Sequence, residues 1–337
     1  MTSSQPVWLS QLLGVQFPED GKSFSISNAS YVMRAGIPRS LDILSPAQAQ
    51  TKDTFGFIWS GEDRFRSDAS LGMLADWYKT NYGDVALAEW WSEYGDLPLV
   101  LDIGCGAGIS ALGLFGDRLR RMRYVGIDVS TAIDAARNRF VDRGLEAIFI
   151  QTSLMTLPFP DSSIDVIYAQ GVLHHTDSTE NALRAATQKL RSGGRLLFYV
   201  YRKKGPVREF MDDYVRAKLQ ALAPDEVWQA MMPITKFGKY LGDLNVEIDV
   251  PENIDLLDIP SGKISLQRFF YWHVFKAFYN TTMSLEELNH VNVDWYAPVN
   301  AHRQTPEQVR SWCLEAGLVI EREHVQESGI SVVARKR

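Results

Sequence analysis

Short apolar runs alternate with segments of helical periodicity along the middle of the chain. The runs cover residues 97–101, 124–128, 147–151, 164–169 and 195–201. Segments with apolar residues at helical spacing separate them, at residues 109–119, at residues 131–143 and from Glu180 onward. Short apolar runs between turn residues are typical of strands buried on both faces of a parallel sheet. The alternation therefore predicts an α/β fold with a doubly wound, mostly parallel sheet.

A glycine-rich turn follows the first of these runs. Residues 97–108 read LPLVLDIGCGAG, in which Asp102 ends the apolar run and Gly104, Gly106 and Gly108 occupy every second position. Glycines let the backbone turn sharply out of a strand and let a ligand lie against main-chain N–H groups at a helix N-terminus. Phosphate- and dinucleotide-binding folds use similar turns, so the turn alone does not identify its ligand.

An acidic residue ends the second apolar run. Asp128 lies 20 residues after Gly108. In nucleoside-binding α/β sheets an acidic residue at this place hydrogen-bonds the ribose hydroxyls. The alternative role is a cap for the next helix, but Ser130 suits that role well. Together, the turn and Asp128 predict a nucleoside site.

The ordered motifs of residues 97–202 resemble those of the class I S-adenosyl-L-methionine-dependent methyltransferases. The matching stretches are VLDIGCGAG, YVGIDVS, LPFPDSSIDVIYAQGVLHH and LRSGGRLLFYV. Two apolar runs at residues 318–325 and 330–334 resemble the last two strands of that family. The resemblance implies a seven-stranded sheet with an antiparallel last strand, together with an N-terminal segment and a helical insertion.

The resemblance also implies a role for individual residues in binding the cofactor, S-adenosyl-L-methionine. Asp102 and the three glycines would bind its methionine part, Asp128 its ribose, and Gln170 would lie beneath the sulfonium. The family usually places an acidic residue near the adenine amino group, within the segment that here includes Ser153 and Leu154. Serine still accepts a hydrogen bond but carries no charge, so adenine recognition is expected to be weaker here.

Candidates for catalysis lie at the carboxyl ends of the fourth and fifth predicted strands. His174 and His175 follow the fourth strand, and histidine suits a general base at neutral pH. The alternative is that one histidine only supports the loop. Tyr201 and Arg202 end the fifth strand at the same edge, where they could orient a polar or anionic acceptor. Cys105 has no paired histidine in its motif, so a structural role is expected for it.

The acceptor is expected to bind beneath a long insertion and an N-terminal aromatic segment. The insertion, residues 203–303, is mainly helical by its pattern. Its end combines an acid, two aromatic residues, a histidine and an arginine; these are Asp294, Trp295, Tyr296, His302 and Arg303. They are either an acceptor-binding segment or a buried polar network that closes the insertion on the sheet. The aromatic residues around Trp59 form either a small core or a flap over the ligand.

These patterns predict that the chain is divided into four parts. Residues 1–82 form an N-terminal cap, 83–202 the cofactor-binding core, 203–303 the insertion, and 304–337 the end of the core sheet. The Gly-Ile-Pro turn at residues 36–38 and the following aromatic segment resemble zinc-ribbon-bearing members of the class. The zinc cysteines are absent from this segment, so no metal is expected there.

Composition restricts the partners and the compartment. The net charge is −6, and no basic stripe is apparent, so nucleic acid is not expected as a partner. No window has the apolar length of a membrane span, and no signal peptide is apparent. With only two cysteines, the chain fits a reducing, cytoplasmic location. We expect a small polar acceptor, while a homodimer, a protein acceptor and a non-catalytic cofactor-binding role remain open.

Overall fold

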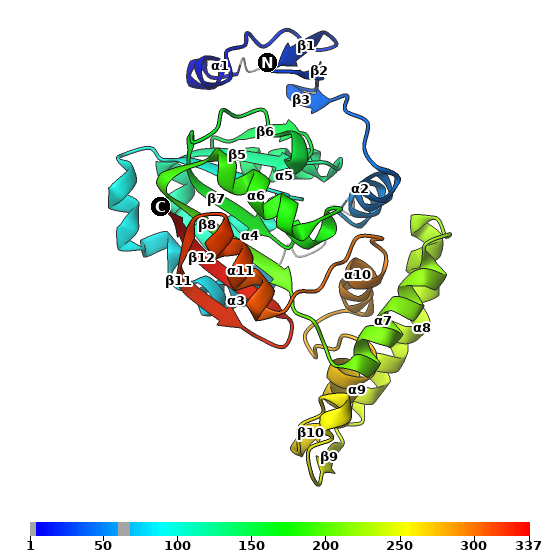
Figure 1. The fold of residues 1–337 in the computed structure, drawn as a ribbon. Coiled ribbons are helices and arrows are strands. Elements are labelled where there is room, and N and C mark those ends of the chain that lie inside the picture. Colours follow the sequence, from blue (N-terminus) through cyan, green and yellow to red (C-terminus); the bar gives the residue numbers. More distant parts are fainter. Residues whose placement is uncertain (1–4, 60–67) are drawn as a thin grey trace.

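A ten-stranded sheet forms the centre of the computed structural model, which describes residues 5–59 and 68–337 (Figure 1). The strand order is β1-β2-β3-β6-β5-β4-β7-β8-β12-β11. The strands are β1 (Ser23–Ile26), β2 (Ala29–Arg34), β3 (Ile37–Ser40), β4 (Leu99–Ile103), β5 (Arg123–Asp128), β6 (Ile148–Gln151), β7 (Ile164–Gln170), β8 (Leu190–Tyr201), β11 (Leu318–Val325) and β12 (Gly329–Lys336). All pairs from β3 to β8 are parallel, and β12 pairs antiparallel with both β8 and β11. The predicted α/β sheet and its antiparallel last strand are confirmed.

The predicted number of seven strands is wrong, because three N-terminal strands extend the same sheet. β1, β2 and β3 form an antiparallel meander, and β3 continues the sheet beside β6. The pairing is fixed by Arg39, whose guanidinium donates to Gln151 Oε1 at 2.7 Å and pairs with Asp134 at 2.6 Å. An open sheet edge presents unpaired N–H and C=O groups, so covering β6 with another strand satisfies them.

Helices cover both faces of the sheet. β8 shows the alternation, since Leu197 and Tyr199 point into one apolar core while Leu196 and Phe198 point into the other. The first core includes side chains of α3 (Asp68–Tyr82), α4 (Ile109–Phe115) and α5 (Ala132–Asp142). The second includes side chains of α1 (Val7–Leu13), α6 (Thr179–Lys189) and α11 (Pro306–Glu315). The carboxyl ends of the parallel strands are therefore held between two packed layers of helices.

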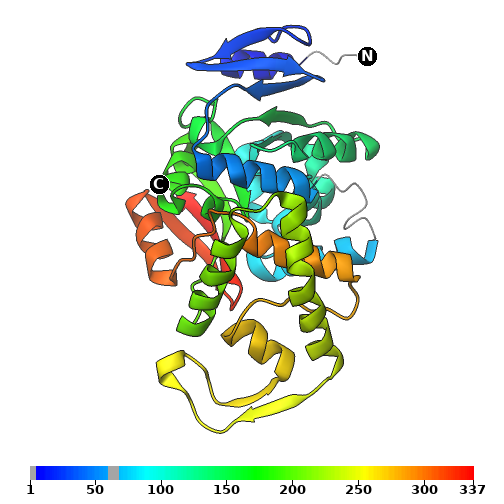
Figure 2. The same ribbon diagram turned by 90° about the vertical axis from the view of Figure 1, so that its right-hand side faces the viewer.

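The insertion protrudes from the core next to the carboxyl end of β8 (Figures 1 and 2). Its elements are α7 (Pro206–Leu219), α8 (Pro224–Asp243), β9 (Glu247–Val250), β10 (Gly262–Ser265), α9 (Leu266–His273) and α10 (Leu285–Tyr296). Figure 2 shows α10 beside α2 (Pro46–Trp59), at the junction of insertion and core. Helix α2, helix α10 and the carboxyl end of β8, which are distant in the sequence, thus lie close together at this edge of the sheet.

Helix α7 buries a charged face, although its sequence pattern predicts that the apolar face is buried. An amphipathic helix would bury its apolar side chains, but Phe210 and Tyr214 are 69% and 54% exposed, whereas Arg208, Asp212 and Arg216 are buried. The reason is tertiary, because the interior of the insertion offers hydrogen-bond partners to charged groups. An amphipathic pattern alone cannot reveal which face those partners occupy.

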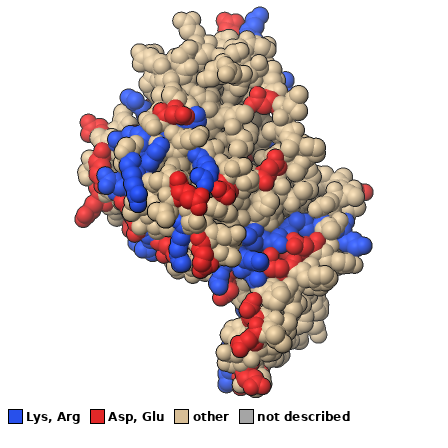
Figure 3. All heavy atoms as spheres, viewed as in Figure 1, with Lys and Arg blue, Asp and Glu red and all other residues tan. Residues whose placement is uncertain are grey.

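Charges of both signs are interspersed on the face of the molecule that Figure 3 shows. Ion pairs join surface charges of opposite sign, for example Arg310 with Glu323 at 2.7 Å and Arg184 with Glu315 at 2.5 Å. Among the described helices, none is long and apolar enough to cross a membrane. Within residues 5–59 and 68–337, no three metal-ligating side chains gather at one place.

Candidate active site

The glycine turn between β4 and α4 forms the floor of the site. Gly104, Gly106 and Gly108 all have positive φ angles, of 67°, 51° and 77°. A Cβ atom at Gly104 would lie 2.4 Å from a methyl carbon of Val172, so only glycine fits there. A Cβ atom at Gly106 would have only Trp59 Nε1 within 4 Å, at 3.9 Å. The turn is therefore packed on one side and open on the other.

Asp102 offers an unused acceptor beside this turn. Its side chain is fully buried, and Oδ2 accepts a hydrogen bond of 2.6 Å from the Tyr124 hydroxyl. Oδ1 is buried without a hydrogen-bond partner. Burial raises the pKa of Asp102 to about 7, although the bond from Tyr124 opposes the shift. A buried acceptor without a partner is unfavourable unless a ligand donor satisfies it.

Asp128 lies next to Gly106, at the end of β5, and is hydrogen-bonded to the turn. Its Oδ2 accepts from the Gly106 N–H at 2.8 Å, and its Oδ1 accepts from the N–H and hydroxyl of Ser130 at 2.7 and 2.6 Å. Burial raises its pKa, and these bonds counteract the shift. A carboxylate has about four acceptor positions. Three are in use, so a ribose would have to share Asp128 with the turn and the start of the next helix.

The residues expected near the adenine and the sulfonium have defined partners. Ser153 Oγ accepts from the Met155 N–H at 3.1 Å, which leaves its own proton for a ligand. The Leu154 side chain is buried in the second apolar core, so only its main chain could meet a ligand. Gln170 Oε1 accepts a hydrogen bond of 2.6 Å from Tyr82, which fixes the amide at the end of β7.

These features fit S-adenosylmethionine. The open turn at Gly106 leaves room for a methionine chain, and the free Asp102 Oδ1 suits its ammonium group. The remaining acceptor position of Asp128 suits a ribose hydroxyl. The acceptors of the site thus match the ammonium group and the sugar of that cofactor.

Both candidate histidines are buried and are poor proton acceptors. Neither ring nitrogen of His174 has a hydrogen-bond partner, and burial lowers its pKa well below the usual value. His175 Nδ1 lies 2.6 Å from the Asn300 carbonyl oxygen, and burial lowers its pKa to about 3. The His174 ring packs on Tyr201 with centroids 3.8 Å apart. The geometry favours the supporting role over that of a base.

A tyrosine–carboxylate pair lies beside these histidines. The Tyr201 hydroxyl donates to Asp294 Oδ2 at 3.2 Å, joining the end of β8 to α10. Burial raises the pKa of Tyr201 well above its usual value, and the Asp294 charge adds to the shift. Tyr201 therefore stays protonated, and Asp294 is the group of the pair that can accept a proton.

Aromatic side chains of α2 approach this edge from the other side. The Phe55 ring meets His175 edge-on at 5.0 Å, and the Trp59 ring meets His290 at 4.9 Å. His290 lies one helical turn before Asp294 on α10, so both occupy one face of the helix. Sequence analysis missed His290, although its spacing of four residues from Asp294 was the available signal. Residues 60–67, part of the predicted aromatic segment, lie outside the described residues.

The remaining expected acceptor residues point elsewhere. Trp295 and Tyr296 are buried and donate to the two oxygens of Asp212, at 2.8 and 2.6 Å. They belong to the buried polar network that was the alternative expectation. Arg202 faces the β11–β12 turn, where it lies 3.6 Å from the Glu327 carboxylate. The structure does not bring Tyr296 and Arg202 together with Asp294, whereas the Trp295 ring packs on Tyr201, the hydrogen-bond partner of Asp294.

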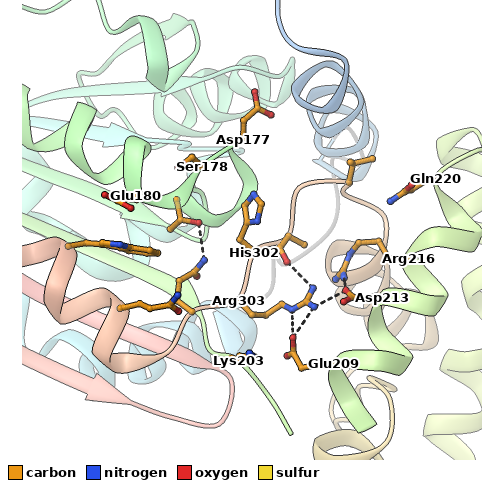
Figure 4. Close-up of a pocket in the computed structure, with 16 residues that line it drawn as sticks. Asp177, Ser178, Glu180, Lys203, Glu209, Asp213, Arg216, Gln220, His302 and Arg303 are labelled. Carbon is orange, nitrogen blue, oxygen red and sulfur yellow. Dashed lines mark hydrogen bonds and ion pairs between the residues drawn. The ribbon is translucent and has the colours of Figure 1, made fainter. Parts of the chain in front are cut away.

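A groove of about 690 Å³ separates α7 from α6 and α11 (Figure 4). His302 and Arg303 line it, together with Arg216 of α7. Arg303 pairs with Glu209 at 2.9 Å and with Asp213 at 2.7 Å, as Figure 4 shows. His302 and Arg303 thus line a surface groove with charges of both signs, and the main-chain N–H of His302 donates to the His174 carbonyl oxygen at 2.9 Å.

The sheet, the glycine turn and Asp128 together define a nucleoside-binding α/β domain. A family model described as a methyltransferase domain matches residues 101–198. This chain therefore carries a class I, Rossmann-like methyltransferase domain, whose cofactor is S-adenosylmethionine.

Curated relatives have related names but match only part of the chain. An uncharacterized methyltransferase of Bacillus subtilis (strain 168), YcgJ, is 32% identical over 39% of this chain and 54% of its own length. The 27-O-demethylrifamycin SV methyltransferase of Amycolatopsis mediterranei (strain S699) is 34% identical over 52% of this chain and 65% of its own length. The chain thus spans less than two thirds of either relative.

Among solved structures, the magnesium protoporphyrin IX methyltransferase of Synechocystis PCC 6803 resembles this chain. The match covers 86% of this chain and all of that one, at 14% identity and a TM-score of 0.46. A likeness this distant carries no argument about the site.

Proposed function

We propose that the chain transfers the methyl group of S-adenosylmethionine to an oxygen or nitrogen atom, less favourably a carbon atom, of a small polar metabolite. The observation that carries the proposal is the buried, unpartnered Asp102 Oδ1 beside a glycine turn that is open at Gly106. A site that only stabilised the fold would gain nothing from leaving this acceptor unsatisfied.

In this proposal the chain's residues bind, orient and exclude water. When bound, S-adenosylmethionine supplies an electrophilic methyl group on its sulfonium. The side chains of Asp102 and Asp128 and the glycine turn fix its two ends. Orientation of the reacting atoms accounts for roughly 7–11 kcal/mol of such a barrier, so precise binding is the main task of the protein.

Proton removal from the acceptor is assigned to Asp294. Tyr201 orients this carboxylate by its hydrogen bond of 3.2 Å, while the pKa of His175, at about 3, makes that residue a weak base. Asp294 is partly exposed and lies on the α10 face shared with His290. The rings of Phe55 and Trp59 cover the same edge and limit the access of water.

A small acceptor fits the crowded approach to this edge better than a large one. Helices α2 and α10 both pack over it, so a folded protein would need them to move apart. Cys105 and Cys313 are both unpaired and buried, which supports the expected cytoplasmic location.

The test measures which class of molecule receives a labelled methyl group. The chain is incubated with methyl-labelled S-adenosylmethionine and a cell extract, which is then separated into small-molecule, protein and nucleic-acid fractions. We expect label in the small-molecule fraction with the wild type and not with Asp128→Ala. Label in the protein fraction would instead favour a protein acceptor, and equal label with both enzymes would contradict the assigned site.

A further inference from the structure

Lys276 places a buried ammonium group inside the insertion. The residue follows α9 and is 6% exposed. Within the described residues its ammonium forms no hydrogen bond and no ion pair, and Nζ lies 4.8 Å from the centroid of the Trp295 ring. Nζ itself keeps a small solvent contact, through which a ligand can reach it. Burying a charge without a partner is unfavourable. Such a group is retained at a cost to stability, which calls for a functional reason.

Positive charge exceeds negative charge around the Trp295 ring. Arg208 Cζ and Lys204 Nζ lie 5.4 and 5.8 Å from its centroid. Asp212 neutralises Arg208 through a bond of 2.8 Å, and its oxygens also accept from Trp295 and Tyr296. The Asp212 carboxylate also accepts from the main-chain N–H of Lys276 at 3.5 Å, so it is fully engaged and forms no ion pair with the Lys276 ammonium.

Lys204 is held by main-chain oxygens, so it brings no carboxylate that would reduce the excess of positive charge around Trp295. Its ammonium donates to the main-chain oxygens of Arg202 and Ser328, at 2.8 and 3.2 Å. Asp294 is the carboxylate whose charge favours protonated Lys276 most. No hydrogen bond or ion pair joins Asp294 to the Lys276 ammonium within the described residues, so Lys276 keeps the capacity to bind one further anion.

The position of Lys276 connects it to the proposed reaction site. Trp295 packs on the Tyr201 ring with centroids 4.4 Å apart, so the two rings bridge Lys276 and the Tyr201–Asp294 pair. On the same helix, His290 contacts Trp59, which lies next to the open side of the glycine turn. His290 and Asp294 share one face of α10, and the next residue, Trp295, provides the contact with Lys276.

We propose that the methyl acceptor carries an anionic group, a carboxylate or a phosphate, that pairs with Lys276. This inference rests on the proposed function and adds the substrate class to it. A lysine ammonium is a compact point charge that serves either anion. The Phe55 and Trp59 rings, which cover the same edge of the sheet, favour an acceptor with a planar or apolar body attached to that group.

The experiment compares ring compounds that differ in charge. Benzoate, phenyl phosphate and neutral benzamide are titrated calorimetrically into the chain, both alone and saturated with S-adenosylhomocysteine. We expect both anions to bind roughly tenfold or more tightly than benzamide, a difference of about 1.4 kcal/mol. Lys276→Met should abolish this preference, and Lys218→Met, at an exposed lysine of the same insertion, should retain it.

The variants separate a binding role from a structural one. Removal of an uncompensated buried charge should leave the fold intact and raise the melting temperature of Lys276→Met above that of the wild type. Lys276→Gln provides a second variant with a polar head, which should also lose the preference. Equal binding of anions and benzamide by the wild type, including no binding of any, or a preference that survives in both variants, would overturn the inference.

Binding of S-adenosylhomocysteine is measured in the same series. If it binds and the anion preference is absent, only the inference about the acceptor fails. If it does not bind, the proposed function fails, whatever the anion titrations give.

Discussion

At the scale of single residues, the site is defined by polar groups that the protein leaves incompletely paired. Asp102 is buried with one free oxygen, and Lys276 is buried with a free ammonium. Both carry pKa values moved to about 7, and burial is the largest cause for each. Their charge states should therefore change near neutral pH, which makes binding measurably pH-dependent.

Asp102→Asn should weaken binding of S-adenosylmethionine and remove part of its pH dependence. Only the ionised carboxylate pairs with an ammonium group, so wild-type affinity should rise between about pH 6 and about pH 8. The asparagine keeps an acceptor for Tyr124 but has no charge, so its affinity should be roughly tenfold or more lower. Calorimetric titration at three pH values measures both effects. The same pH slope in the variant would show that another group causes it.

Anion binding at Lys276 should change with pH in the opposite direction. Because its pKa is lowered to about 7, the lysine loses its charge as the pH rises, and benzoate affinity should fall between about pH 6 and about pH 9. The charged and titratable groups around it are Asp294 on α10, Arg208, Asp212 and Arg216 on α7, His175 after β7, and Lys204, whose Nζ lies 5.8 Å from the same Trp295 ring. Because the pKa of Lys204 is also lowered to about 7, the fall in affinity is assigned to Lys276 only if Lys204→Met retains it. The pKa of His175, at about 3, excludes it as the titrating group in this window. A flat benzoate profile would contradict the assignment.

At the scale of elements, the strand–turn–helix units could be predicted because their signals are local. The turn after β4 needs glycines for its own backbone, and Asp128 is near enough in sequence to be recognised by spacing. Helix α7 could not be predicted in the same way. Arg208 donates to the Tyr271 carbonyl oxygen and Asp212 accepts from Trp295, residues that are 63 and 83 positions away. Burial of the charged face depends on these distant partners.

Gly104→Ala should destabilise the fold more than Gly171→Ala. Both glycines have nearly the same positive φ, 67° and 69°, so the backbone strain is matched. A Cβ atom at Gly104 would meet Val172, whereas nothing lies within 4 Å of a Cβ atom at Gly171. The difference in the free energy of unfolding should be about 1–3 kcal/mol, measured by urea denaturation.

A double variant checks the cause of that difference. Adding Val172→Ala to Gly104→Ala should recover part of the lost stability, since it removes the methyl groups that the new Cβ meets. No recovery would mean that the positive φ, rather than the contact, limits this position.

Two neighbouring aspartates test the buried face of α7. Asp212 is fully buried and accepts from Arg208, Trp295 and Tyr296, whereas the Asp213 side chain is 60% exposed. Asp212→Ala should cost about 3–5 kcal/mol because it leaves Arg208 uncompensated. Asp213→Ala should cost less than about 1 kcal/mol. Equal losses in urea denaturation would contradict the inverted orientation of α7.

At the scale of the whole molecule, the two functions of the site come from different parts of the chain. The cofactor side uses the ends of β4, β5 and β7, where sequence motifs predicted the residues. The proposed acceptor side combines α2, α10 and the segment after α9, whose polar residues only the structure distinguishes. Asp294 accepts from Tyr201 at the end of β8, whereas His302 and Arg303 line the groove beside α7. Spacing along the chain could not distinguish these environments.

The most direct measurement is calorimetric titration of S-adenosylmethionine and S-adenosylhomocysteine into the wild type, Asp128→Ala and Asp142→Ala. Asp128 shares its carboxylate between the glycine turn and the proposed ribose, while Asp142 is an exposed residue at the end of α5. We predict one site in the wild type and in Asp142→Ala, and affinity lower by roughly tenfold or more in Asp128→Ala. No binding of either compound by the wild type, or unchanged affinity in Asp128→Ala, would contradict the assignment of this sheet edge as the cofactor site.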